Sequence, residues 1–401
     1  MGGSDAVQHY YGPIKIFIVA GEASGDALGA RLMQALGRLT EQGDAAVFDG
    51  IGGPEMEATG LRSRFPMSEL SVAGLIEVLP HIRRLSRRID ETVAAVRTFK
   101  PDVLVTIDSP GFSKRLAARL GTTDFPKVHY VAPTVWAWRP KRAFKFKALF
   151  DRLLCLLPFE PPYFEAVGLD APFVGHSVLE SGADKGDGAA FRNRRGISPD
   201  SKVICVLPGS RKGEATRLLP VFCETIARIA EAATDGITVV MPLVPHLRDL
   251  VETAVADWQV PVHIVTGGHG EKYDAMAASN VALAASGTVS LELAMANVPT
   301  VVAYRVNPLT YEILNRLIYC KYVNLINLLA DDRIVPELLQ KDCTPNRIAP
   351  VLESLLGEDG QKQIARAAQM VATLSPADGV APSMAAARAV LETVTRGKAK
   401  N

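Results

Sequence analysis

The sequence predicts an α/β protein with two domains, each built around a parallel sheet. The chain has 401 residues, which is more than one domain usually holds. Short continuous apolar runs alternate with helical patterns along both halves of the chain. This alternation is typical of parallel strands that helices cover on both faces. Each half also opens with the same unit, a strand followed by a Gly-rich turn and a helix.

The first half contains four predicted strands. The apolar run 15–20 leads through the turn VAGEASGDALG (19–29) into a helical pattern. Further strands are predicted at 102–107, 127–132 and 152–157. The turn resembles a phosphate-binding loop, but it carries two carboxylates, Glu22 and Asp26.

The second half begins after a change of composition near residue 180. The small, polar and Gly-rich stretch LESGADKGDGAA predicts a linker at 181–190. The run KVICVL (202–207) then enters the turn PGSRKGE (208–214), which a long helical pattern follows. Four more strands are predicted in the segments ITVVMPL, VHIVTG, VALAAS and TVVAYR.

These patterns also predict the domain boundaries. We expect a disordered tail at 1–13, domains at 14–180 and 191–358 on either side of the linker, and a C-terminal helix at 359–401. The last segment is expected to pack across the first domain or onto a partner chain. Ligands of parallel sheets bind at the carboxyl ends of the strands, so the active site is expected in a cleft between the two domains.

The composition excludes several classes of protein. A formal net charge of +1 argues against a nucleic-acid binder that relies on bulk charge. The five cysteines are scattered without a CxxC pair, which favours a reducing compartment. We see no signal sequence and no apolar window long enough to span a membrane. A cytoplasmic protein is therefore expected.

The turn 208–214 is the strongest candidate for an anion site. Gly209 and Gly213 let backbone amides approach an anion closely, and Ser210 adds a hydroxyl. Arg211 can donate two hydrogen bonds to a phosphate at the positive end of the helix that follows. The alternative is an ordinary strand-to-helix turn with a surface arginine. The turn is not a Walker A loop, because no Gly-Lys-Ser/Thr stands at the required spacing.

The segment ASGTVSLELA (285–294) repeats this arrangement. Ser286, Gly287 and Thr288 form a turn between a strand and a helix, and Glu292 follows early in that helix. Two such turns in one domain favour a shared diphosphate, with Glu292 on sugar or ribose hydroxyls. The alternative is that the serine and threonine only cap the helix.

Asp108 is the candidate catalytic residue of the first half. It ends a predicted strand in the segment IDSPGF, where a carboxylate that faces a cleft can act as a general base. The alternative is an Asx-turn or a helix cap.

Two further segments combine apolar and basic residues. Segment 68–89 places apolar residues at helical spacing beside clustered arginines, which favours contact with a membrane surface. The residues expected at this contact are Val72, Leu75, Ile76, Leu79, Arg83 and Arg84. The alternative is a core-packed helix with a solvated basic face. Segment 135–147 holds two of the three tryptophans among basic residues, and it favours an interfacial anchor, a nucleic-acid stacking surface or a structured loop.

No metal site is predicted. The seven histidines form no pair at ligand spacing, no D-x-D motif occurs, and the pair Asp331-Asp332 is weak evidence by itself.

Several strings in this order resemble the lipid-A-disaccharide synthases over residues 14–395. They are GEASGD, SVAGLIEVLPHI, IDSPGF, HYVAPTVWAWRPKR, LPFE, FVGHS, LPGSR with Glu214, ASGTVSLE, and NLLA with VPELLQ. The resemblance implies an inverting hexosyltransferase with two Rossmann-like domains facing a central cleft, the GT-B architecture. Its members join UDP-2,3-diacylglucosamine to 2,3-diacylglucosamine 1-phosphate, forming a β-1,6-linked tetraacyl disaccharide 1-phosphate and UDP. This is a step of bacterial lipid A biosynthesis.

The resemblance also implies roles for particular residues. Asp108 matches the family's catalytic aspartate, and Arg211, Glu292 and Asn327 match its donor-site residues, with Gln340 as a further donor contact. The resemblance implies no metal or cofactor and no nucleic acid. It implies peripheral association with the cytoplasmic face of the inner membrane and leaves a homodimer open.

The assignment of phosphate binding to the second domain changes the meaning of the first turn. We interpret that turn as the acceptor side of the site, where Glu22 and Ser24 lie beside the sugar and Asp26 caps the following helix. The sequence departs from the family pattern at Gly111, where many members have a second aspartate, and at Asp331-Asp332-Arg333. The competing hypotheses are a UDP-N-acetylglucosamine epimerase or hydrolase on the same fold and a non-enzymatic nucleotide- or lipid-binding protein.

Overall fold

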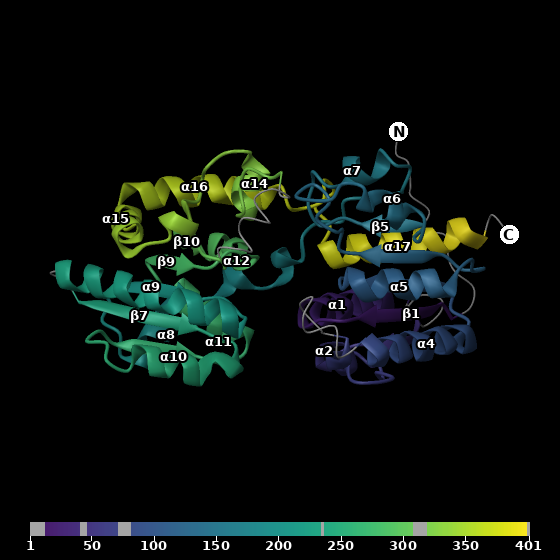
Figure 1. Cartoon of the computed structure of the whole chain (residues 1–401), viewed down its shortest axis with the longest axis horizontal. Helices are drawn as coiled ribbons and strands as arrows, with labels where there is room; N and C mark the ends of the chain where they lie inside the picture. Colours follow the sequence, from purple (N-terminus) through teal and green to yellow (C-terminus); the bar gives the residue numbers. More distant parts are fainter. Residues whose placement is uncertain (1–12, 41–45, 71–81, 234–235, 308–318, 399–401) are drawn as a thin grey trace. The chain divides into compact units, whose positions relative to one another are not determined.

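A computed structural model of the chain describes residues 13–40, 46–70, 82–233, 236–307 and 319–398. The chain divides into two compact units (Figure 1). Unit 1 combines the residues up to 177 with those from 374 onward, and unit 2 spans 178–373.

Unit 1 contains a five-stranded parallel sheet in the order β2-β1-β3-β4-β5. Its strands are β1 (Lys15–Ala20), β2 (Val47–Ile51), β3 (Val103–Ile107), β4 (Lys127–Tyr130) and β5 (Arg152–Leu154). Its helices are α1 (Ala23–Thr40), α2 (Pro54–Ala58), α4 (Ile82–Phe99), α5 (Pro110–Leu120), α6 (Arg142–Lys147), α7 (Pro161–Glu165) and α17 (Pro382–Lys398), with a 3-10 turn η1 at Met67–Glu69.

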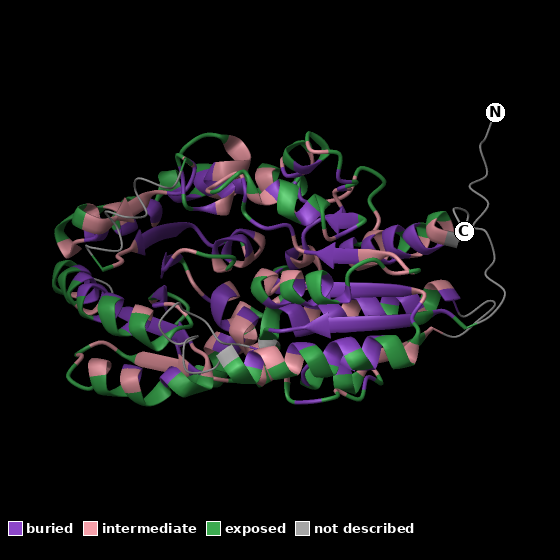
Figure 2. Ribbon diagram, turned by 45° about the vertical axis from the view of Figure 1, so that its right-hand side comes forward, coloured by how far each residue is buried: buried purple, intermediate pink, exposed green. Residues whose placement is uncertain are grey.

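The alternation of side chains along β1 explains the layers of unit 1. Ile16 and Ile18 pack in a core formed with α1 and α17, whereas Phe17 and Val19 pack in a second core formed with α4 and α5. The central strands are therefore buried on both faces, as their continuous apolar sequence predicts. Figure 2 shows these strands as buried and the outer helices as banded between buried and exposed residues.

Unit 2 contains a six-stranded parallel sheet in the order β11-β10-β9-β6-β7-β8. Its strands are β6 (Lys202–Leu207), β7 (Ile237–Pro242), β8 (Val262–Val265), β9 (Val281–Ala284), β10 (Thr300–Tyr304) and β11 (Glu337–Leu339). Its helices are α8 (Gly188–Arg195), α9 (Lys212–Ala232), α10 (Arg248–Val255), α11 (His269–Ala277), α12 (Val289–Met295), α14 (Leu325–Ala330), α15 (Pro345–Leu355) and α16 (Glu358–Ala372). One core joins the sheet to α9, α10 and α15, and another joins it to α8, α11 and α12.

The structural division differs from the expected boundaries at the segment 181–190. This segment belongs to unit 2, where it contains a 3-10 turn at Ala183–Lys185 and the start of α8. The backbone N–H of Asp187 donates to Asp274 Oδ1 of α11 at 2.8 Å, and Ala183 is fully buried. The small residues therefore allow close packing here, and the segment is not a free linker.

The expected C-terminal segment 359–401 also divides between the two units. Helix α16 belongs to unit 2, whereas α17 packs on α1, β3 and β5 of unit 1 (Figure 1). Arg152 of β5 donates to the carbonyl of Ala389 at 2.7 Å, and Val390 of α17 is fully buried. The chain thus returns to its first unit, because the small side chains of α17 complete that core.

No helix in the described ranges has both the length and the apolar character needed to cross a bilayer.

Candidate active site

The strand order of each sheet reverses at one point, and this reversal places the candidate residues. In unit 1 it lies between β1 and β3, where Ala20 is aligned with Ile107. In unit 2 it lies between β6 and β9, where Leu207 is aligned with Ala284. Ligands of open α/β sheets bind at such points, at the carboxyl ends of the strands. The four turns that the sequence singled out therefore lie in pairs, one pair in each unit.

Asp108 lies in a strained turn at the end of β3. It and Ser109 have φ angles of 50° and 45°, values that side chains other than glycine adopt at a cost of about 1–3 kcal/mol each. The Asp108 N–H donates to the carbonyl of Tyr130 at 2.9 Å. Its carbonyl accepts from Ser113 Oγ at 3.0 Å, and its Oδ1 accepts from the Ser109 N–H at 2.8 Å. These bonds fix the carboxylate at the tip of the strand, and an accumulation of strain there is typical of functional sites.

The turn after β1 lies against this carboxylate. Ser24 Oγ donates to Asp108 Oδ2 at 3.4 Å. A Cβ atom on Gly21 would lie 2.7 Å from Ser109 Oγ, so only glycine lets the two turns approach this closely. Glu22 and Ser24 are both exposed at this end of the sheet. The structure thus brings the predicted acceptor-side residues together with Asp108.

The sequence predicted that Asp26 caps the helix α1, and this prediction is wrong. Asp26 is 3% exposed, and its carboxylate accepts from the N–H groups of Gly53, Glu55 and Met56 at 2.8–3.0 Å. It therefore caps α2, a helix that begins 28 residues later in the chain at Pro54.

The turn after β6 leaves the start of α9 open. Arg211 is the N-cap residue of this 21-residue helix, and its side chain makes no capping hydrogen bond to the helix start. Ser210 and Arg211 are exposed, and Arg211 has no carboxylate partner among the residues that the structure describes. Free N–H groups, the positive end of a helix and a guanidinium together form a setting for an anion.

The Glu214 side chain packs against this turn. Gly209 has a φ of 102°, and a Cβ atom there would overlap the Glu214 carboxylate. Burial and the hydrogen-bonded Glu214 carboxylate raise the pKa of Tyr304 to about 12. Glu214 thus has a partner within the protein, and its contact with a donor stays a prediction.

The turn after β9 adds a second set of candidate groups. Gly287 and Thr288 are exposed, and Ser286 Oγ donates to the carbonyl of Val323 at 3.3 Å. On α12, Glu292 accepts from Lys272 Nζ at 2.6 Å and from the Tyr273 hydroxyl at 2.9 Å. These two bonds orient the Glu292 carboxylate and leave it lone pairs for ligand hydroxyls. Sequence reasoning missed Lys272 and Tyr273, because α11 carries no local signal for a partner on α12.

Asn327 lies within the fold rather than at its surface. It is fully buried, and its Nδ2 donates to the carbonyl of Val335 at 2.8 Å and to Glu337 Oε1 at 2.9 Å. Its Oδ1 accepts from the N–H groups of Ile334 and Val335 at 2.8 Å each. All the hydrogen-bonding groups of this side chain are therefore used, so the expected direct contact with a donor is not supported.

Gln340 also uses its amide within the protein. With the amide nitrogen facing the carbonyl of Val306 at 3.3 Å, its oxygen accepts from the Val306 N–H at 3.1 Å. Gln340 therefore holds the end of β11 to the segment that follows β10.

Segment 68–89 is described only in part. Val72, Leu75, Ile76 and Leu79 lie outside the described residues. Within α4, Leu85 and Ile89 are buried in the core of unit 1. This part of the segment thus matches the alternative of a core-packed helix.

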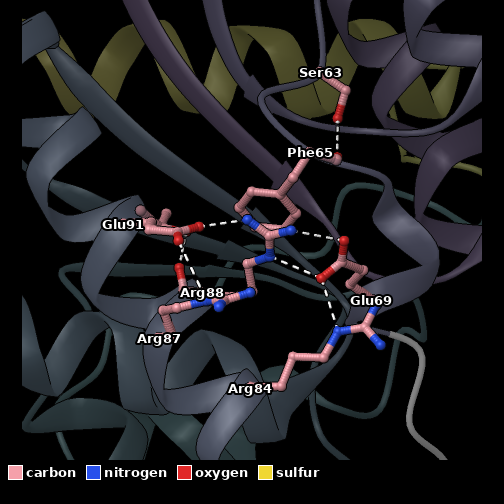
Figure 3. Close-up of polar contacts among 8 residues, drawn as sticks. Ser63, Phe65, Glu69, Arg84, Arg87, Arg88 and Glu91 are labelled. Atoms are coloured by element: carbon pink, nitrogen blue, oxygen red, sulfur yellow. Dashed lines mark hydrogen bonds and ion pairs between the residues drawn. The ribbon is translucent and has the colours of Figure 1, made fainter.

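Two arginines of α4, Arg84 and Arg88, contact one carboxylate, Glu69 (Figure 3). Arg84 Nε lies 2.9 Å from Glu69 Oε2, and Arg88 forms two bonds of 2.7 Å to the same carboxylate. Hydrogen bonds from Arg88 and Arg84 lower the pKa of Glu69 to about 2. Arg84 therefore has a partner within the protein, whereas Arg83 is exposed.

Segment 135–147 forms a structured loop and helix α6. Trp136 Nε1 donates to Glu160 Oε1 at 3.2 Å, and Trp138 lies with its ring 4.2 Å from the guanidinium of Arg142. Glu160 is 3% exposed and also accepts from the N–H groups of Leu156 and Leu157. Burial raises the pKa of Glu160 to about 7, although these three donors lower it.

Within the described ranges, no three histidine, cysteine, aspartate or glutamate side chains form a group that could hold a metal ion. Asp331 lies 3.7 Å from Lys321, and Asp332 lies 2.7 Å from Arg366.

Comparisons with known proteins agree with this arrangement. A family model described as lipid-A-disaccharide synthetase matches residues 16–387. The lipid-A-disaccharide synthase of Rhodospirillum centenum is 51% identical over 388 residues, covering 96% of each chain.

Two solved structures show the same fold. One is a Neisseria meningitidis UDP-GlcNAc 2-epimerase bound to UDP-GlcNAc, with a TM-score of 0.61 and 12% identity over 96% of this chain and all of that one. The other is the calicheamicin glycosyltransferase CalG4, with a TM-score of 0.61 and 17% identity over 96% of this chain and 99% of that one.

The fold and the paired turns define a class of two-domain proteins with the GT-B architecture, which glycosyltransferases and UDP-GlcNAc 2-epimerases share. The chain belongs to the lipid-A-disaccharide synthase family. It is a hexosyltransferase of lipid A biosynthesis that takes a UDP-sugar and an acceptor. The likeness to epimerases concerns the fold alone, so the alternative of an epimerase gains no support beyond the fold.

Proposed function

We propose that the chain transfers 2,3-diacylglucosamine from UDP to the 6-hydroxyl of 2,3-diacylglucosamine 1-phosphate. The products are a β-1,6-linked tetraacyl disaccharide 1-phosphate and UDP. The observation that carries this proposal is the contrast between the two reversal points. Unit 1 holds a fixed carboxylate there, Asp108, and unit 2 holds an uncapped helix start with an exposed Arg211.

Unit 2 binds the diphosphate of the donor in this proposal. The N–H groups at the start of α9 and the guanidinium of Arg211 stabilise the negative charge that develops as UDP leaves. Glu292, held by Lys272 and Tyr273, accepts hydrogen bonds from the donor's hydroxyls. Asn327 and Gln340 act indirectly, by holding the turns and strand ends in place.

Asp108 acts as the general base. A carboxylate oxygen accepts the proton of the acceptor's 6-hydroxyl as the oxygen attacks the anomeric carbon, and the bond to the diphosphate breaks in the same step. Attack on the face opposite the leaving group inverts the anomeric configuration. Gly111 stands where many family members have a second aspartate, so one carboxylate performs this task here.

Membrane contact by segment 68–89 remains part of the proposal. Arg83 is exposed on α4, and it follows the apolar residues Val72, Leu75, Ile76 and Leu79 in the sequence. Replacement of Leu75, Ile76 and Leu79 by serine is expected to reduce binding to liposomes without unfolding the protein. Unchanged partitioning would remove this segment from the membrane contact.

The transfer reaction has a direct test. The protein is incubated with UDP-diacylglucosamine, with and without the monosaccharide 1-phosphate, and UDP release is followed. Release that depends on the acceptor supports the proposal, and acceptor-independent release indicates a hydrolase or epimerase. If no UDP is released, the result indicates a protein that binds its ligand without catalysis. The proposed chemistry needs no metal ion, so EDTA is expected to leave the rate unchanged, and a loss of rate that Mg²⁺ restores would contradict this.

A further inference from the structure

Helices α5 and α6 form a basic surface in unit 1 that the proposed transfer step does not use. Ala117 of α5 and Ala143 and Phe146 of α6 share one apolar core. Lys114 Nζ of α5 lies 5.9 Å from the centre of the Phe146 ring. The two helices therefore pack together, and Arg115, Arg142 and Lys145 lie close to Lys114.

The cations on this surface have no carboxylate to neutralise them. Lys114, Arg115, Arg142 and Lys145 form no ion pair with any residue in the described ranges. Burial lowers the pKa of Lys114, and the charges of Arg142, Lys145 and Arg115 lower it further. Like charges at close range repel one another, so an uncompensated cluster favours a bound anion.

Three of these side chains, those of Lys114, Arg115 and Lys145, line a hollow. Its volume is about 440 Å³, and its lining includes Gly111, Lys114, Arg115 and Lys145. Ala118 and Leu149 add an apolar part, and the neighbouring Phe144 has 64% of its surface exposed. The surface thus suits an anionic group that is attached to a larger and partly apolar molecule.

The hollow lies along α5, the helix that follows the candidate general base. Gly111 is in the first turn of α5, three residues after Asp108, and Lys114 is about 4.5 Å further along the helix at 1.5 Å per residue. In glucosamine 1-phosphate, C1 carries the phosphate and C5 carries the CH₂OH group with the 6-hydroxyl, and both carbons are bonded to the ring oxygen, so the two groups lie near one another. One molecule can therefore present a hydroxyl to Asp108 and a phosphate to the lysines of α5 and α6.

We propose that the hollow between α5 and α6 binds the phosphate group of the acceptor, with Lys114 and Lys145 as its main contacts. This inference rests on the proposed function and adds to it the element that recognises the acceptor. The ligand class is a sugar phosphomonoester, whose charge the three cations that line the hollow neutralise through charge-assisted hydrogen bonds.

A kinetic comparison tests the inference. Lys114→Gln and Lys145→Gln are each expected to raise the KM for the acceptor about tenfold, since each removes one charge-assisted hydrogen bond to the phosphate. The KM for the UDP-sugar is expected to stay unchanged. Lys147→Gln is the matched control, because Lys147 is exposed at the end of the same helix.

An acceptor that lacks the 1-phosphate makes the test specific. For the wild type, removal of the phosphate is expected to raise the KM for the acceptor. For Lys114→Gln the same removal should raise this KM much less, because the two changes remove the same interaction. Equal penalties in both proteins would overturn the inference.

A second experiment distinguishes binding of the acceptor phosphate from binding of an anionic membrane. Binding to vesicles that contain phosphatidylglycerol is measured for the same variants, and kinetics are run in uncharged detergent micelles. Loss of vesicle binding with an unchanged KM for the acceptor would overturn the inference and assign the surface to lipid.

Calorimetric titration with glucosamine 1-phosphate keeps the inference separate from the proposed function. Binding by the wild type that Lys114→Gln abolishes supports the hollow even if no disaccharide forms. Equal binding by both proteins, or none by either, would overturn the inference even if the transfer reaction is demonstrated.

Discussion

The turns after β1 and β6 begin with the same elements, a strand, a Gly-rich turn and a helix, yet they are opposite in charge. In unit 1, the buried Asp26 carboxylate accepts from three N–H groups at the start of α2. In unit 2, the start of α9 has no side-chain cap and Arg211 is exposed. A carboxylate of the first turn thus binds the N–H groups at the start of α2. The N–H groups at the start of α9 stay available for a ligand.

The second pair of turns extends this contrast. After β3, a strained backbone holds Asp108 at the tip of the strand. After β9, the exposed Gly287 and Thr288 precede Glu292, whose charge Lys272 balances. In the proposed function, the same fold thus provides a site for proton removal in unit 1 and a site for a diphosphate in unit 2. A carboxylate in such a Gly-rich turn therefore argues against a phosphate ligand at that turn.

The largest effect is expected from Asp108→Asn. Loss of a general base usually lowers kcat by about 10²–10⁴-fold, and UDP binding should not change because UDP is assigned to unit 2. Steady-state kinetics and calorimetry check both points. Asp90→Asn is the control, since Asp90 is exposed on α4. Near-normal turnover of Asp108→Asn would remove Asp108 from this role.

Arg211→Gln is expected to weaken UDP binding by about 10- to 100-fold, as loss of a charge-assisted hydrogen bond does. Calorimetric titration with UDP measures this. Arg228→Gln, on an exposed face of the same helix, should bind UDP as the wild type does. A wild-type affinity of Arg211→Gln would show that the open start of α9 is not the phosphate site.

Glu160 gives a pH dependence of stability. Its pKa is about 7 in the folded protein and 4.5 in the reference state, so the folded state binds its proton more tightly. Its contribution to the free energy of unfolding is therefore fully present below pH 4.5 and is lost as pH rises to about 7. A shift of this size corresponds to at most about 3 kcal/mol.

The measurement is a difference between the wild type and Glu160→Gln in urea unfolding between pH 5 and 7. A difference is needed because buried His129 and His176 have pKa values lowered to about 3 and about 4, which makes stability rise with pH in this range. If the two proteins have the same pH dependence, Glu160 is ionised throughout.

Asp26→Ala is expected to lower the free energy of unfolding by about 1–2 kcal/mol, because it removes the cap of α2. Urea denaturation measures this loss. The affinity for UDP should stay at the wild-type value. A selective loss of UDP binding in a stable variant would contradict the role of the Asp26 carboxylate as a cap of α2.

Local patterns in the sequence predicted the elements that depend on nearby residues. The apolar runs predicted the buried strands, and the ends of these runs predicted the turns at Asp108 and Arg211. The reversal points then follow from the strand order, which brings the turns together in pairs.

Contacts between distant residues were not predictable in this way. Asp26 bonds to the backbone of Gly53, and Lys272 on one helix bonds to Glu292 on another. Asn327 matched a donor-site residue by motif, but Ile334, Val335 and Glu337 use all its hydrogen-bonding groups. These partners lie on separate elements, so only the fold determines which groups remain free for a ligand.

Amide hydrogen exchange with and without UDP tests the central claim, which assigns the nucleotide to the turns of unit 2 and the acceptor to those of unit 1. Saturating UDP is expected to protect peptides that cover 208–214 and 285–292 and to leave those that cover 21–26 and 108–113 unchanged. Protection of the two turns of unit 1 without protection of the two turns of unit 2 would contradict the account.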